Sequence, residues 1–234
     1  MRRDDGSMLK FYGEGIPGVT LEELSGRLLV IEGADGSGRS TQIELLKDYL
    51  ENTGRAVANV GLVRSTLVSN ELNEAKLGNV LSEITRSLFY ATDFADQLEN
   101  IIMPALRAGF IVLADRYIYT LMAREIVRGA DRQWVRFLYS IALVPHLVMY
   151  LKVSPGRLME RNLHKKASLD YWESGQDMGI SRNIFDSFLR YQRLIQNEFS
   201  LMQVEYGFQV VNGNLSIRSV SRDICTRVES LLGG

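Results

Sequence analysis

The sequence predicts an α/β protein in which a parallel sheet of five strands has helices on both faces. Five short apolar segments, rich in Val, Ile and Leu and without polar alternation, are typical of strands buried on both sides. These strands are predicted at 27–33, 56–62, 110–115, 146–153 and 208–212. Segments with helical spacing lie between and around them, at 39–53, 79–107, 118–141, 155–166, 181–205 and 216–232. Alternation of strand and helix along the whole chain indicates a three-layer, doubly wound fold.

Composition and charge exclude several classes of function. The 234 residues suffice for one α/β domain with a full core. A formal net charge of −1 gives no sign of a surface that coats nucleic acid. No apolar run has the length of a membrane span, and the first residues lack the apolar centre of a signal peptide. Because Cys225 is the only cysteine, we expect no internal disulfide and a cytoplasmic protein.

We expect one domain, residues 26–234, after a short N-terminal extension, residues 1–25, that could be loose. Gly129-Ala130-Asp131 and Pro145 separate helices rather than domains. Charged and small residues interrupt the helical pattern at 164–179, "HKKASLDYWESGQDMG". This segment is either mobile or an ordinary polar connection.

Residues 33–41, "GADGSGRST", follow a predicted strand and open a predicted helix. Their spacing is that of a Gly-x-x-x-x-Gly-Lys-Ser/Thr phosphate-binding loop. Glycines let the backbone turn so that N–H groups converge on phosphate oxygens, and the helix adds its positive end. The predicted ATP-binding residues are Gly33, Asp35, Gly36, Ser37, Gly38, Arg39, Ser40 and Thr41. A plain strand–helix turn is the alternative.

Arg39 stands where this pattern has lysine. Arginine keeps the positive charge, but its guanidinium group is larger and planar. We therefore expect nucleotide binding to survive this exchange more readily than accurate transfer of the terminal phosphoryl group.

Charged residues also follow two other predicted strands. Asp115 and Arg116 end the strand at 110–115, and Arg64 lies just beyond the strand at 56–62. A carboxylate there can organise Mg²⁺ or an acceptor oxygen, and an arginine can hold a phosphate with two parallel hydrogen bonds. The alternative for Asp115 and Arg116 is a surface ion pair.

In several segments the sequence resembles the thymidylate kinase family. The similar segments are "LLVIEGADGSGRSTQ", "VRS", "LFYATDFADQLENIIMPALRAGFIVLADRY", "LKVSPGRLMERN" and "LDYWE", within residues 26–230. The resemblance implies a P-loop NTPase fold with a five-stranded parallel sheet and a short lid at about 160–180. It also implies phosphate transfer from Mg-ATP to dTMP, and a homodimer.

Roles for single residues follow from the resemblance. Asp35 would approach the acceptor sugar, Ser40 and Asp115 would serve the Mg²⁺ ion, and two arginines would surround the acceptor phosphate and the transferred group. The implied catalytic residues are Arg39, Arg64, Asp115 and Arg116, and the implied acceptor-binding residues are Asp35, Arg64, Phe94, Arg116 and Arg124.

Besides Arg39, three positions depart from the family pattern. Phe94 stands where the family usually has an arginine that contacts thymine, and it could stack on a base or pack in the core. Arg124 replaces a tyrosine beside the acceptor sugar, and Tyr171 replaces an arginine of the lid. The remaining lid cations, Arg161, Lys165 and Lys166, could cover the transferring group or form a solvated helix face.

Three functions stay open on this basis. The first is an ATP-dependent kinase for a nucleoside monophosphate, with dTMP as the family's acceptor. The second is a nucleotide-binding paralogue in which Arg39 and the missing lid arginine impair transfer. The third is a kinase for another phosphorylated acceptor, to which Phe94 and Arg124 point. The expected partners are ATP and a nucleoside monophosphate, without nucleic acid or membrane.

Overall fold

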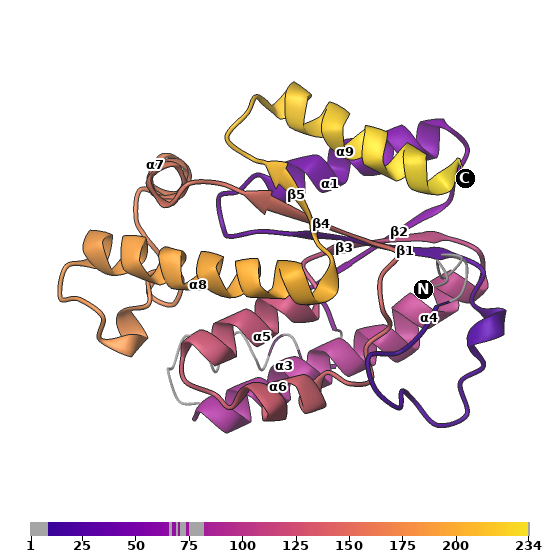
Figure 1. Cartoon of the computed structure of the whole chain (residues 1–234), viewed down its shortest axis with the longest axis horizontal. Coiled ribbons are helices and arrows are strands. Elements are labelled where there is room, and N and C mark those ends of the chain that lie inside the picture. Colours follow the sequence, from indigo (N-terminus) through magenta and orange to yellow (C-terminus); the bar gives the residue numbers. More distant parts are fainter. Residues whose placement is uncertain (1–8, 66, 69, 71–73, 75–81, 234) are drawn as a thin grey trace.

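The computed structural model describes residues 9–65, 67, 68, 70, 74 and 82–233. It contains one parallel sheet of five strands in the order β2-β3-β1-β4-β5 (Figure 1). The strands are β1 (Arg27–Glu32), β2 (Val57–Gly61), β3 (Ile111–Asp115), β4 (Leu147–Lys152) and β5 (Gln209–Asn212). All five strands predicted from the sequence are confirmed, and no strand end differs from the prediction by more than one residue.

Helices cover both faces of the sheet (Figure 1). One face carries α1 (Arg39–Asn52) and α9 (Ile217–Leu232). The other face carries α3 (Glu83–Gln97), α4 (Met103–Arg107), α5 (Ile118–Val127) and α8 (Ile184–Tyr206), with α6 (Arg132–Leu138) beside them. Helix α7 (Pro155–Lys166) lies at the end of β4. No helix among the described residues is long and apolar enough to cross a membrane.

Strand β1 explains why the strands lack polar alternation. Leu28 and Val30 enter the core on the side of α5 and α8, whereas Leu29 and Ile31 enter the core on the side of α1 and α9. Because successive side chains of a strand point to opposite faces, a strand covered on both faces must be apolar at every position.

Two predicted helices are divided in the structure. The segment 118–141 forms α5 and α6, separated at Gly129, which has a φ of +98°. Asp131 then caps α6 by accepting a hydrogen bond from the Trp134 N–H at 2.8 Å. The described part of 79–107 forms α3 and α4, joined by the π-helical turn η2 (Leu98–Ile102). A π turn inserts one residue into the helical repeat, and apolar spacing alone does not reveal it.

The N-terminal extension is not loose from Leu9 onward. The Tyr12 N–H donates to the Ala142 carbonyl at 2.9 Å, and the Val144 N–H donates to the Lys10 carbonyl at 2.7 Å. Leu9 and Leu24 are buried in the main core. A 3₁₀ turn, η1 (Leu21–Glu23), precedes β1. Residues 1–8 of the predicted extension lie outside the described residues.

The order of the strands brings the predicted site together. Asp115 at the end of β3 is in register with Ile31 of β1 on one side and with Gly61 of β2 on the other. The glycine-rich loop after β1 and the Arg64 segment after β2 therefore flank Asp115. Ligands of open α/β sheets bind at this carboxyl edge.

Candidate active site

The glycine-rich loop has a backbone that requires its glycines. A Cβ on Gly33 would lie 2.8 Å from Ser37 Oγ and 3.0 Å from the Leu151 carbonyl oxygen. Gly36 and Gly38 have φ values of +81° and +96°, which other residues rarely adopt. Apart from Gly38 itself and its two neighbours in the chain, no described residue has an atom within 4 Å of the position that a Gly38 Cβ would take. The loop is therefore tightly wound and open at the point where α1 begins.

Helix α7 supports this loop from outside. Asn162 Nδ2 donates to the Asp35 carbonyl oxygen at 2.9 Å, and a Cβ on Gly36 would lie 2.7 Å from the same nitrogen. Arg161 Nη1 donates to the Ser37 carbonyl oxygen at 3.2 Å. The predicted lid cation Arg161 thus contacts the loop backbone.

Arg39 lies inside the loop. Its Nε donates to Asp115 Oδ1 at 2.8 Å, and its Nη1 donates to the carbonyl oxygens of Gly33 and of Ala34, the latter at 2.8 Å. Only 7% of the residue is exposed. Burial alone would raise the pKa of Asp115, but the charge and hydrogen bond of Arg39 hold that pKa below its ordinary value. The planar guanidinium group of Arg39 therefore joins the start of the loop to the end of β3.

The side-chain oxygen atoms of Ser40 and Asp115 lie close together beside the loop. Ser40 Oγ donates to Asp115 Oδ2 at 3.3 Å, and Arg64 Nη2 lies 3.7 Å from the same carboxylate oxygen. Mg²⁺ prefers oxygen ligands and usually keeps several waters or phosphate oxygens around it. A hydroxyl and a carboxylate beside a phosphate loop fit that requirement.

Two buried polar atoms beside the loop have no partner among the described residues. They are Ser37 Oγ and Arg116 Nε. Buried polar groups are nearly always hydrogen-bonded, and an unmatched one calls for a specific explanation. Both atoms can donate to phosphate oxygens, so the loop and Arg116 fit a phosphorylated ligand.

Arg116 has a strained backbone. Its φ is +71°, which costs a residue with a Cβ roughly 1–2 kcal/mol. Its Nη2 lies 2.7 Å from Asp35 Oδ1 of the loop. Buried Glu32 fixes the next residues, because it accepts hydrogen bonds from the Tyr117 N–H at 2.9 Å and from Thr120 Oγ1 at 2.5 Å.

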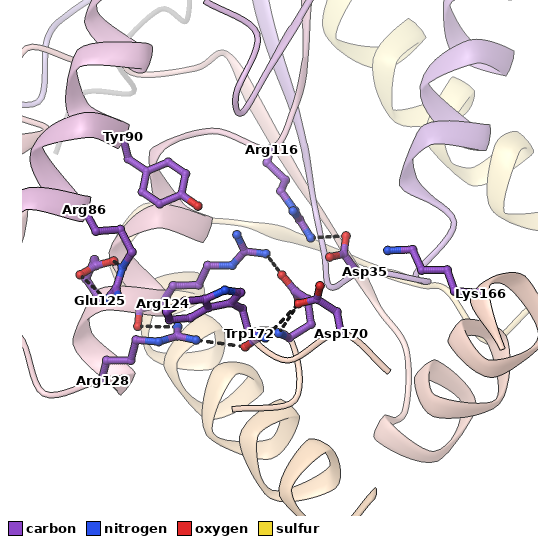
Figure 2. Close-up of a pocket in the computed structure, with 11 residues that line it drawn as sticks. Asp35, Arg86, Tyr90, Arg116, Arg124, Glu125, Arg128, Lys166, Asp170 and Trp172 are labelled. Carbon is purple, nitrogen blue, oxygen red and sulfur yellow. Dashed lines mark hydrogen bonds and ion pairs between the residues drawn. The ribbon is translucent and has the colours of Figure 1, made fainter. Parts of the chain in front are cut away.

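A cavity of about 460 Å³ lies beside the loop (Figure 2). Asp35 and Arg116 border it on one side of the view, and Arg86 and Glu125 border it on the other. Its lining is rich in arginine and carboxylate groups: Asp35, Arg86, Tyr90, Arg116, Arg124, Glu125, Arg128, Lys166, Asp170, Trp172 and Glu173. Its size is in the usual range for sites that hold a small organic ligand.

The segment predicted to be mobile or an ordinary connection forms one wall of this cavity. Arg124 of α5 forms an ion pair with Glu173. One turn further, Arg128 Nε lies 2.7 Å from Asp177 Oδ2, and its Nη2 donates to the Trp172 carbonyl oxygen at 3.0 Å. Arg124 of α5 and Arg128, the residue that follows this helix, therefore hold the segment around Trp172 in the cavity wall.

Phe94 does not line the cavity. Only 5% of it is exposed, and its ring contacts Tyr117 and Tyr139 edge-on at centroid distances of 5.2 and 6.0 Å. Of the two roles considered for Phe94, the structure therefore has core packing rather than stacking on a base. Its neighbour one turn earlier on α3, Tyr90, lines the cavity instead.

The remaining predicted residues lie at different places. Lys166 lines the cavity, and its side chain extends toward Asp35 in Figure 2. Lys165 is exposed and is not among the lining residues. Tyr171 is 47% exposed and contacts the Trp172 ring edge-on.

Sequence reasoning missed several residues of the site. Those that line the cavity are Arg86, Glu125, Arg128, Asp170, Trp172 and Glu173, and those that support the loop or its neighbours are Glu32 and Asn162. Asp170, Trp172 and Glu173 lie in the family-like segment "LDYWE", which could have pointed to them. Glu32 carried a signal of its own, because a carboxylate that ends an apolar strand must find buried donors.

A glycine-rich loop between strand and helix, a carboxylate at the end of the adjacent strand, and a cationic cavity beside them define a P-loop nucleotide kinase. The sequence profile described as "Thymidylate kinase" matches residues 31–224. The chain belongs to the thymidylate kinase family.

Individual relatives agree with this assignment. A probable thymidylate kinase 2 of Saccharolobus solfataricus is 38% identical, over 86% of this chain and 94% of the relative. A thymidylate kinase of Thermosipho africanus is 30% identical, over 87% of this chain and 98% of the relative. A probable thymidylate kinase of Thermococcus kodakarensis is 27% identical, over 88% and 98% respectively.

Proposed function

We propose that this protein transfers the γ-phosphoryl group of Mg-ATP to a nucleoside monophosphate, and that dTMP is its acceptor. The observation that carries the proposal is the position of Arg116. Its guanidinium group contacts Asp35 of the phosphate loop and also lines the cavity. A donor phosphate in the loop and an acceptor phosphate in the cavity would therefore meet at one cation.

Catalysis would consist of positioning and charge stabilisation. The loop N–H groups and the N-terminus of α1 bind the phosphates of ATP, and Arg39 fixes the loop that carries them. Ser40 and Asp115 would hold Mg²⁺, which neutralises phosphate charge when bound. Arg64 and Arg116 hold the acceptor phosphate in line with the γ-phosphate. No covalent intermediate is needed, because an acceptor phosphate oxygen is already a nucleophile.

Lys166 is the lid cation best placed to cover the transferring group. It lines the cavity on the side of Asp35, whereas Arg161 is bonded to the loop backbone. A flexible ammonium group can follow the charge that develops on the equatorial phosphoryl oxygens.

The impaired paralogue remains the rival function. The inward position of the Arg39 guanidinium favours it, since that group is already bonded to Asp115 and to the loop carbonyls. The contact between Ser40 and Asp115 and the ion pair between Asp35 and Arg116 favour an active enzyme. These two contacts hold in place the side chains that Mg²⁺ binding and acceptor binding would need.

We also propose that the chain forms a homodimer through α3. Ile84 and Leu88, one turn apart on this helix, are 63% and 48% exposed. Exposed apolar side chains on one helical face support an interface. Light scattering on the purified chain tests this, and Leu88→Glu should convert a dimer to a monomer.

The activity is tested by measuring ADP formation from Mg-ATP with dTMP, dUMP, dCMP, dAMP and dGMP in turn. Asp115→Ala serves as the blank. Turnover that is fastest with dTMP supports the proposal. Turnover with another monophosphate would move the function to a kinase with a different acceptor. Absence of turnover with all five, together with measurable ATP binding, would favour the impaired paralogue.

A further inference from the structure

Arg86 of α3 lies in the cavity wall away from the phosphate loop (Figure 2). Although it is charged, only 8% of the residue is exposed. Its guanidinium carbon lies 5.5 Å from the centre of the Trp172 ring. An arginine over an aromatic face gains cation–π attraction and is held in one plane. Arg86 is therefore a fixed group rather than a mobile surface cation.

Glu125 of α5 holds Arg86 loosely. Two contacts join them, from Arg86 Nε and Nη2 to the two carboxylate oxygens, and both are 3.5 Å long. The carboxylate has a stronger partner in Ser87, whose Oγ donates to Glu125 Oε2 at 2.6 Å. The buried charge of Arg86 is thus balanced, while its one hydrogen bond to Glu125, from Nη2, is at the limit of useful length.

The guanidinium group keeps unused donors. It carries five N–H bonds, and among the described residues Glu125 is its only hydrogen-bonding or ionic partner. A ligand or a water molecule in the cavity can accept from these donors. The cavity that Arg86 borders is where such an acceptor would lie.

We propose that Arg86 determines the base specificity of the acceptor site by donating to the 4-carbonyl oxygen of the base. The inference rests on the proposed function. With the acceptor phosphate at Arg116, the base would extend toward the opposite wall, where Arg86 and Trp172 lie. The acceptor class is then a monophosphate of a 4-oxo pyrimidine, thymine or uracil.

Cytosine differs from these bases at the group that Arg86 would read. Its 4-amino group presents hydrogens to a guanidinium group that can only donate. A site built to hydrogen-bond one group of a substrate rejects an analogue that leaves the buried partner unmatched. Arg86 would therefore select dTMP over dCMP through the acceptor KM.

The test compares kcat/KM for dTMP and for dCMP in the wild type, in Arg86→Met and in Arg86→Gln. Methionine keeps the length of the side chain without donors, and glutamine offers a polar, neutral group to Glu125. We expect the ratio of dTMP to dCMP to fall by at least about tenfold in both variants. KM for ATP should stay unchanged. Arg190→Met is the matched control, because Arg190 is an exposed, ion-paired arginine of α8 outside the cavity.

The outcomes separate this inference from the proposed function. A wild type that phosphorylates none of the monophosphates defeats the proposed function. An active wild type whose variants keep the original ratio, or whose KM rises equally for both acceptors, overturns the role of Arg86 alone. Preference of the wild type for dCMP also overturns it. If Arg86→Met shows no cooperative unfolding transition, Arg86→Gln decides the question.

Discussion

Arg39 Nε lies 2.8 Å from Asp115 Oδ1, so the cation in the lysine position joins the phosphate loop to the neighbouring strand. The same guanidinium group also donates to the Gly33 and Ala34 carbonyls at the start of the loop. A guanidinium group, with donors that point in several directions, can reach these three acceptors better than the single ammonium group of lysine. In this structure the loop is built around arginine.

The first prediction concerns Arg39→Lys. Lysine should keep the charge but lose part of this set of hydrogen bonds, each worth about 1.5–3 kcal/mol when a charged group takes part. We expect kcat no higher than that of the wild type and a lower thermal unfolding midpoint. Steady-state kinetics and calorimetry measure both. A tenfold or greater gain in kcat would mean that the native loop is impaired.

Ser40→Ala tests the Mg²⁺ site that we propose at Ser40 and Asp115. The variant removes one of the two oxygen atoms that converge beside the loop. We expect the Mg²⁺ concentration for half-maximal rate to rise by roughly tenfold or more, since a lost ligand weakens a site that has few protein ligands. Ser200→Ala is the control, because Ser200 is an exposed serine of α8. If the rates of Ser40→Ala and Ser200→Ala depend on Mg²⁺ concentration in the same way, Ser40 is not a ligand of the metal.

Arg116→Gly separates catalysis from stability. The glycine relieves the strained φ of +71° but removes the guanidinium group. We expect kcat/KM for the acceptor to fall by roughly 100-fold or more, while the free energy of unfolding changes by no more than about 1 kcal/mol. An active glycine variant would contradict the role given to Arg116.

His146 should make the stability depend on pH. Burial, and then the charge of Arg27, lower its pKa from 6.5 to about 4. The unfolded chain therefore takes up a proton near pH 6.5, whereas the folded chain resists it until about pH 4. The contribution of neutral His146 is fully present above pH 6.5 and is lost as the pH falls toward 4.

His146→Asn provides the measurement. His146 Nδ1 accepts a hydrogen bond from the Leu28 N–H at 3.0 Å, and an asparagine oxygen can accept it too. The variant should lose less stability than the wild type between pH 6.5 and pH 4, by up to about 3 kcal/mol. Denaturant titrations at several pH values test this. Parallel pH profiles for the two chains would show that His146 does not titrate in this range.

The sheet could be predicted from the sequence because its physical cause is local. Leu28 to Ile31 must be apolar at every position once helices cover both faces, and this leaves a pattern in the sequence. The phosphate loop was predictable for a similar reason. Gly33 and Gly36 are required by backbone geometry and close contacts, and their spacing is conspicuous.

The cavity wall that contains Arg86 and Trp172 could not be predicted in the same way. Arg86 and Trp172 lie against each other in one wall of the cavity although they come from distant parts of the chain. Trp172 belongs to the segment "LDYWE", but nothing in the sequence indicates that its ring meets Arg86, because burial of an arginine depends on partners that only the folded chain brings near. The same reason explains Phe94, whose core role follows from contacts with Tyr117 and Tyr139.

The most direct measurement follows the phosphoryl group itself. Wild-type protein is incubated with dTMP and Mg-ATP labelled at the γ-phosphate, and the products are separated. The proposed function predicts label in dTDP, in a one-to-one ratio with ADP, and none with Asp115→Ala. Label that appears only in inorganic phosphate, or that stays in ATP although the nucleotide is bound, would contradict it.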